Sequence, residues 1–212
     1  MGKKYEQAEP KKSQRTVFQE YSEAFVVAVV LAILIRALLV QAFKIPSGSM
    51  IPTLLVGDHI LVNKLVYGIR IPFTTLRWPR LSEPKRGDVI VFVYPEDRTK
   101  DFIKRVVAGG GETVEIRNKQ VYIDGKPVAS PYARFLTNTV IPGELSPRDN
   151  MAPIRVPEGQ LFVMGDNRDA SHDSRWWKFV PVEDVKGEAF LIYYSAENLL
   201  GIRWNRIFNV IR

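Results

Sequence analysis

Two serines stand in a short segment of the chain that is bracketed by prolines. Ser47 and Ser49 lie between Pro46 and Pro52. Proline fixes φ and lacks an N–H, so the segment between the prolines resists becoming regular helix or strand. Gly48 accepts backbone conformations that other residues avoid, so both hydroxyls could point into one cleft. This pattern predicts a nucleophilic serine, which needs a neighbouring base to take its proton.

A lysine is the base that the sequence favours. Lys104 lies in a largely apolar run over 102–107, and strand alternation places it on one face with Val106. Burial without a carboxylate partner lowers the pKa of a lysine from about 10.4, so that a neutral amine can accept a proton near pH 7. Two alternatives stay open: a solvent-facing lysine on a strand edge, and a histidine triad that uses His59 or His172.

A polar segment over 165–177 is the third candidate for the site. Its density of Asp, Asn and Ser is typical of a loop built from Asx turns. Asp173 and Arg175 could pair and stiffen that loop. Taken alone, so polar a segment indicates a surface loop held together by Asp–Arg pairs.

Composition narrows the classes of partner and cofactor. The net charge of +7 comes from 30 Lys and Arg against 23 Asp and Glu, which suits contact with anionic lipid or nucleic acid. No helix-turn-helix, zinc-finger or RNA-binding signature accompanies the charge, so phospholipid is the expected partner and nucleic acid is not. Without cysteine, and with only His59 and His172, we expect neither a metal nor another cofactor.

The chain near its N-terminus predicts a membrane anchor. Positions 24–40 are apolar except for Arg36, and about 17–25 such residues cross a bilayer as a helix. We therefore predict a cytoplasmic basic tail over 1–22 and a single transmembrane helix over 23–42, with everything after it extracytoplasmic. The orientation follows from the basic residues that precede the apolar run: Lys3, Lys4, Lys11, Lys12 and Arg15. A buried soluble helix and a cleaved signal peptide are the alternatives.

The remainder of the chain predicts an all-β core. Short β-rich runs alternate with Gly-Asp turns, which argues for coiled antiparallel sheets or a partial barrel. Proline-rich residues 130–157 interrupt this pattern. The expected fold is thus mainly β, with core parts over 43–108 and 158–195, a small inserted β subdomain over 109–157, and a basic and apolar tail over 196–212 that is suited to a membrane interface.

In these features the chain resembles the bacterial type I signal peptidases, which are membrane-bound serine proteases. The resemblance extends from the anchor to residue 195, with its motifs in family order. It is carried by five segments: Ile45–Leu54, Gly57–Val62, Arg86–Val89, Ile103–Arg105 and Gly165–Asp169. It implies cleavage of signal peptides from exported preproteins after small residues at positions −3 and −1, in the bacterial cytoplasmic membrane.

The resemblance also implies roles for individual residues. Ser49 would be the nucleophile and Lys104 the general base, without a histidine. Ser47 and the backbone N–H of Ser49 would form the oxyanion hole. Ser171 would orient the lysine, with Asp173 and Arg175 supporting the site. Shallow pockets for the substrate would be built by apolar residues, namely Phe43, Ile45, Leu54, Ile60, Phe102 and Ile103.

Some positions depart from the family pattern. Ala170 stands where the family usually has Asn, and 109–112 read Gly-Gly-Gly-Glu in place of Leu-Pro-Gly-Asp. Both departures flank the catalytic positions and put local turn geometry in doubt more than activity. Two rival functions remain: a self-cleaving repressor-type Ser–Lys protease, which the anchor disfavours, and a non-catalytic membrane-anchored β-domain for binding or scaffolding, which would need neither Ser49 nor Lys104.

Overall fold

The computed structural model describes residues 17–70, 77–78, 81–198 and 201–212. The chain separates into two units, Met1–Ala37 and Leu38–Arg212. Residues 1–16 of the predicted basic tail lie outside the described residues.

Helix α1 covers Val17–Leu38 in the first unit. Its apolar side chains between Phe25 and Leu31 are exposed. Over the part of the chain that the structure describes, no helix combines the length and the apolarity that a membrane crossing requires. The spanning helix predicted over 23–42 is therefore not supported by the structure. Positions 40–42 are extended rather than helical, because they pair with a neighbouring strand.

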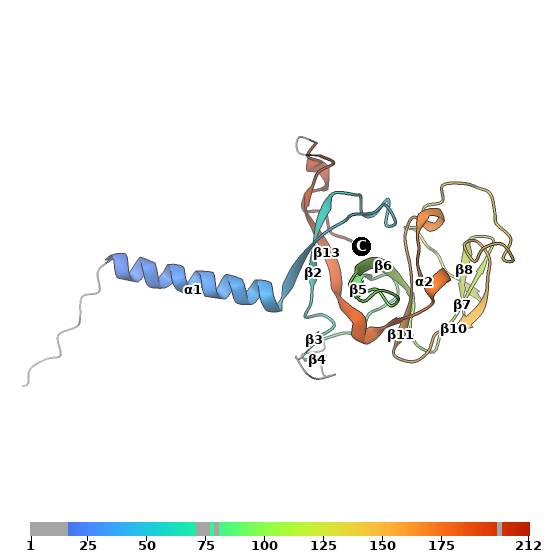
Figure 1. The fold of residues 1–212 in the computed structure, drawn as a ribbon, viewed down its shortest axis with the longest axis horizontal. Coiled ribbons are helices and arrows are strands. Elements are labelled where there is room, and N and C mark those ends of the chain that lie inside the picture. Colours follow the sequence, from blue (N-terminus) through green and yellow to red (C-terminus); the bar gives the residue numbers. More distant parts are fainter. Residues whose placement is uncertain (1–16, 71–76, 79–80, 199–200) are drawn as a thin grey trace, which may run out of the picture. The chain divides into compact units, whose positions relative to one another are not determined.

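The second unit is built on a seven-stranded antiparallel sheet in the order β1-β2-β13-β5-β6-β11-β12 (Figure 1). Its strands are β1 (Val40–Lys44), β2 (Asp58–Asn63), β5 (Val89–Val93), β6 (Asp101–Ala108), β11 (Gln160–Met164), β12 (Val180–Pro181) and β13 (Val185–Ser195). Register shifts occur where β13 pairs with β2 and with β5, and where β11 pairs with β6. Such irregularities bend strands and increase their twist, as a coiled sheet requires.

A second sheet, in the order β10-β7-β8-β9, lies within the predicted insertion between β6 and β11 (Figure 1). It consists of β7 (Thr113–Arg117), β8 (Gln120–Ile123), β9 (Lys126–Pro127) and β10 (Met151–Arg155). Strands β7 and β8 form a hairpin, with Asn118 and Lys119 at positive φ in its turn. The short strands β3 (Ile69–Arg70) and β4 (Arg77–Trp78) form a separate pair.

Short helices occupy the polar segment and the last part of the chain: η1 (Arg168–Ala170), α2 (Ser174–Trp177), η2 (Val182–Asp184) and η3 (Trp204–Arg206). The tail packs onto the sheet, since Ile211 joins a buried cluster and Arg206 forms an ion pair with Asp58 at 2.6 Å. Trp204 and Phe208 nevertheless remain 73% exposed. Contact of this tail with lipid stays a prediction.

Candidate active site

The structure brings Ser49 and Lys104 together. Ser49 lies in the proline-bracketed loop after β1, and Lys104 lies in the middle of β6. The Lys104 Nζ atom is 2.7 Å from the Ser49 Oγ atom. Lys104 is only 4% exposed and Ser49 9%. A buried amine in hydrogen-bond contact with a hydroxyl is the geometry that proton removal from a serine requires.

The surroundings of Lys104 favour its neutral form. Burial lowers the pKa of Lys104 to about 8, and the positive charge of Arg175 acts in the same direction. The carboxylates of Asp173 and Asp166 oppose this shift of the pKa. The Phe102 ring lies 5.4 Å from the amine, on the same face of β6. Among the described ion pairs none involves Lys104, so desolvation is not offset by a direct carboxylate contact.

The nucleophile loop is tied to the polar segment by backbone contacts. The Asn167 N–H donates to the Ser49 carbonyl at 3.0 Å, and the Asn167 side-chain amide donates to the Gly48 carbonyl at 3.0 Å. Gly165 packs between Ser49 and Ser171. A Cβ atom at position 165 would lie 2.2 Å from the Ser171 Oγ atom and 2.5 Å from the Ser49 carbonyl oxygen. Neither Asn167 nor Gly165 was predicted from sequence to have a role of its own, because their contacts join distant parts of the chain.

Ser47 is the second hydroxyl of the loop. Its Oγ atom lies 3.5 Å from the Ser49 Oγ atom. The two serines are therefore on the same side of the loop, although the φ of the intervening Gly48 is not positive. A donor at this position is close to where an oxyanion would form after attack by Ser49.

The predicted supporting residues form one buried cluster. Asp173 and Arg175 make a bidentate ion pair with both contacts at 2.8 Å, and the Gly165 N–H donates to Asp173 at 3.0 Å. Burial raises the pKa of Asp173, but the charge of Arg175 and these hydrogen bonds outweigh it and hold the pKa below its usual range. The Ser171 hydroxyl is buried and has no hydrogen-bond partner among the described residues.

A second buried ion pair lies beside the site. Arg105 contacts both carboxylate oxygens of Asp166, at 2.8 and 2.7 Å, and donates to the Gly87 carbonyl at 2.6 Å. Thr53 donates to the same carboxylate at 2.5 Å, so the end of the nucleophile loop is held there too. None of Arg105, Asp166 and Thr53 was predicted from sequence to support the site.

A cleft of about 230 Å³ opens beside the dyad. Phe102 and Ile103 line it, together with Asp101 and His172. The other apolar residues predicted for substrate contact are placed differently: Ile45, Leu54 and Ile60 are buried in the hydrophobic core, with Phe43 packed against them. Their contact with substrate stays a prediction.

Neither histidine contacts the candidate nucleophile among the described residues. His172 lines the cleft, and its Nε2 atom is 3.3 Å from the Tyr94 hydroxyl. His59 lies in β2 and packs edge-on against Tyr193 and Tyr194. The amine of Lys104 therefore occupies the position that a histidine triad would have given to an imidazole.

Comparison with known proteins identifies similar sequences. The family described as "Signal peptidase, peptidase S26" matches residues 18–194. The signal peptidase I of Aquifex aeolicus (strain VF5) is 39% identical over 221 residues, covering 80% of this chain and 82% of that protein. The signal peptidase I of Pseudomonas fluorescens is 38% identical over 214 residues, covering 87% of this chain and 75% of that protein. A solved signal peptidase I from Enterococcus faecalis V583 is 33% identical over half of this chain, but its TM-score of 0.41 is too low to bear on the fold.

Proposed function

Because the chain belongs to the signal peptidase family, peptidase S26, we propose that it removes signal peptides from exported preproteins through a Ser49–Lys104 dyad. Members of this family are serine peptidases, and this chain is one. The observation that carries the proposal is the 2.7 Å contact between the Lys104 amine and the Ser49 hydroxyl in a buried setting.

Acylation begins with proton transfer from Ser49 to Lys104. With a pKa of about 8, roughly one Lys104 amine in ten is neutral at pH 7. The neutral amine takes the hydroxyl proton as the serine oxygen attacks the scissile carbonyl. The resulting ammonium then protonates the leaving amine, and the scissile C–N bond breaks to leave an acyl-enzyme. Water, deprotonated by the same amine, releases the signal peptide from Ser49.

Charge that develops on the carbonyl oxygen needs donors placed in advance. We assign this role to the Ser47 hydroxyl and the Ser49 backbone N–H. The 3.5 Å separation of the two serine hydroxyls supports the assignment. A single oxyanion donor is worth about 10²–10³ in turnover in other serine proteases.

Ser171, Asp173 and Arg175 are proposed to position the dyad rather than to react. The Asp173–Arg175 pair braces Gly165, and Gly165 in turn contacts both Ser171 and the nucleophile loop. Ser171 would orient the Lys104 amine. Its hydroxyl is buried next to Gly165 and would make that contact.

Substrate selection would occur in the cleft next to the dyad. Phe102 and Ile103 present apolar surface beside Ser49, which suits small side chains at positions −1 and −3 of a signal peptide. We propose that Phe43, Ile45, Leu54 and Ile60 form the floor beneath these residues and limit the depth of the pockets.

We further propose that the apolar run over 24–40 anchors the enzyme in the bacterial cytoplasmic membrane by a single pass. The sequence supports this, since the run carries one charge, Arg36. The N-terminus would then be cytoplasmic and the catalytic unit extracytoplasmic, on the side where exported preproteins emerge. Resistance of membrane-bound protein to carbonate extraction would support the anchor, whereas full extraction would contradict it.

The experiment that tests the proposed function is incubation of purified full-length protein with a preprotein, followed by sequencing of the new N-terminus. Cleavage after a small residue, with small residues at −1 and −3, is expected. The Ser49→Ala variant serves as the matched control for a contaminating protease. A non-catalytic anchored β-domain would leave the preprotein intact in both samples.

A further inference from the structure

Arg168 is a buried arginine for which the proposed chemistry has no use. It begins η1 and is only 4% exposed. Among the described residues, its guanidinium makes no ion pair or hydrogen bond, and its Nε atom is buried without a partner. Burial lowers the pKa of Arg168 to about 10, which still leaves it charged at neutral pH. A buried charge without a partner is strongly destabilising unless something compensates it.

The two carboxylates whose charges act on Arg168 are already paired with other arginines. Asp166 is held by both ends of the Arg105 fork, and Asp173 by the Arg175 fork. Each of these ion pairs is electrically neutral. They therefore leave the single positive charge of Arg168 uncompensated.

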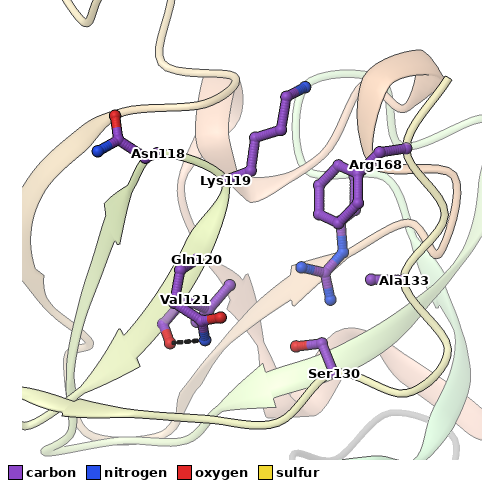
Figure 2. Close-up of a pocket in the computed structure, with 8 residues that line it drawn as sticks. Asn118, Lys119, Gln120, Val121, Ser130, Ala133 and Arg168 are labelled. Carbon is purple, nitrogen blue, oxygen red and sulfur yellow. Dashed lines mark hydrogen bonds between the residues drawn. The ribbon is translucent and has the colours of Figure 1, made fainter. Parts of the chain in front are cut away.

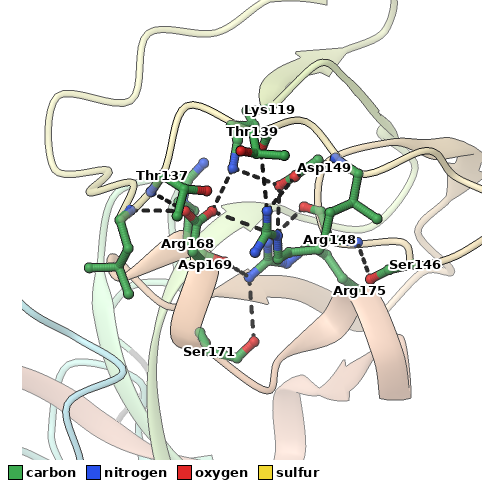
Figure 3. Close-up of polar contacts among 12 residues, drawn as sticks. Lys119, Thr137, Thr139, Ser146, Arg148, Asp149, Arg168, Asp169, Ser171 and Arg175 are labelled. Carbon is green, nitrogen blue, oxygen red and sulfur yellow. Dashed lines mark hydrogen bonds and ion pairs between the residues drawn. The ribbon is translucent and has the colours of Figure 1, made fainter.

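The polar cluster around Asp169 of η1 is balanced as well. Lys119 and Arg148 share the carboxylates of Asp149 and Asp169 (Figure 3). Two cations thus meet two anions there. Every carboxylate of these described ion pairs is thus paired, and the charge of Arg168, like that of protonated Lys104, has no ion-pair partner there.

The Arg168 side chain points into a pocket of about 200 Å³, which is lined also by the β7–β8 turn and by Ser130, Ala133 and Phe135 (Figure 2). Its guanidinium is directed toward Ser130, whereas the Lys119 amine points away from it (Figure 2). The pocket exceeds by several times the roughly 30 Å³ that one water occupies in the liquid. Ser130 and Gln120 also line this pocket.

We propose that this pocket binds a phosphate group, with Arg168 as its charged ligand and Ser130 as a second donor. A guanidinium donates two parallel hydrogen bonds to adjacent oxygens of a phosphate. The remaining oxygens of a tetrahedral anion can accept from donors outside that plane, such as the Ser130 hydroxyl. Arg168 directly follows Asn167, which holds the nucleophile loop. The bound group would therefore brace the segment on which Ser49 rests.

The first test measures thermal unfolding of the full chain in detergent against inorganic phosphate, at ionic strength held constant with sodium chloride. Phosphate stabilises proteins generally, so the informative quantity is the difference between variants. At phosphate tenfold above its Kd, wild type should gain about 3–5 °C more than Arg168→Gln. Arg134→Gln, an exposed arginine of the neighbouring segment, is the matched control and should behave like wild type. An equal gain in all three proteins would overturn the proposal.

A second measurement does not depend on how the variants fold. In wild type, the side-chain Nε–H resonance of Arg168 should shift with phosphate and saturate, whereas that of Arg134 should not. A parallel titration with soluble dihexanoyl phosphatidylglycerol separates a lipid headgroup from the free ion as the source of the phosphate. A saturable response to either compound supports the site. No response of Arg168 to both compounds contradicts it.

Discussion

Lys104 and Arg105 are neighbours on β6 and equally buried at 4%, yet the protein treats their charges in opposite ways. Arg105 lies in a bidentate ion pair with Asp166. Lys104 has no carboxylate contact among the described residues and instead faces a serine hydroxyl. Burial is the same for both side chains, so burial alone does not determine the function of a cation. The partner of the cation determines it. A carboxylate keeps the side chain charged and stabilises the fold, whereas a hydroxyl leaves an amine that can lose its proton.

The largest expected effect comes from replacing either residue of the Ser49–Lys104 dyad. Ser49→Ala and Lys104→Met should each lower kcat for preprotein cleavage by at least about 10⁴-fold, because the nucleophile and its base act as a unit. Methionine keeps most of the lysine's volume without its amine. Lys104→Met should unfold at or above the wild-type temperature, since it removes a buried, desolvated amine. Near-normal turnover by Lys104→Met would refute the dyad.

Replacing Arg105, which is ion-paired with Asp166, should instead lower the free energy of unfolding. Arg105→Met leaves the Asp166 carboxylate buried without its main partner, which typically costs about 3–5 kcal/mol of unfolding free energy. Arg117→Met is the matched control, because Arg117 forms a bidentate pair with Glu115 at the surface. The control should leave the melting temperature nearly unchanged. Chemical denaturation of both variants measures the contrast, which disappears if Arg105 is no more important than a surface arginine.

The contact between the nucleophile loop and the polar segment over 165–177 can be tested at Gly165. In Gly165→Ala the new Cβ atom would meet the Ser171 hydroxyl and the Ser49 carbonyl at 2.2 and 2.5 Å, so the nucleophile loop must move. A displacement near 1 Å can lower kcat by about 10²-fold. Gly109→Ala is the control, since a Cβ atom added there would have no neighbour within 4 Å and the φ of Gly109 is not positive. Equal activity in the two variants would show that the loop does not depend on this packing.

Local patterns in the sequence predicted the Ser49–Lys104 dyad better than the Arg105–Asp166 ion pair. Alternation along an apolar run placed Lys104 on a buried face, and the prolines around Ser47 and Ser49 predicted an irregular loop. The Arg105–Asp166 pair joins residues that are 61 positions apart, so no local spacing reveals it. The role of Gly165 is also invisible in sequence, because it arises where segments near 49 and 171 meet. The β-rich core was predictable, whereas the position of β13 between β2 and β5 depends on tertiary pairing.

The pH dependence of kcat/KM tests the Lys104 amine directly. Because burial lowers the pKa of Lys104 to about 8, kcat/KM should rise about tenfold per pH unit below that value and level off above it. The direction in which stability changes with pH follows from the same lowered pKa of Lys104. The unfolded chain holds this proton up to about pH 10.4, so wild type gains stability relative to Lys104→Met as the pH rises from about 8 to 10. A profile with its midpoint near 6.5 would instead indicate a histidine.

The smallest effect is expected at Ser171, whose proposed role is only to orient the amine. Ser171→Ala should lower kcat by about tenfold or less and leave KM unchanged, because the dyad itself stays intact. A hydroxyl that merely fills space would also lower stability slightly, so activity alone does not separate the two roles. The separating measurement is the midpoint of the pH profile, which moves only if the hydroxyl interacts with one protonation state of Lys104 more than the other. An unchanged midpoint together with unchanged kcat would assign Ser171 to packing against Gly165 alone.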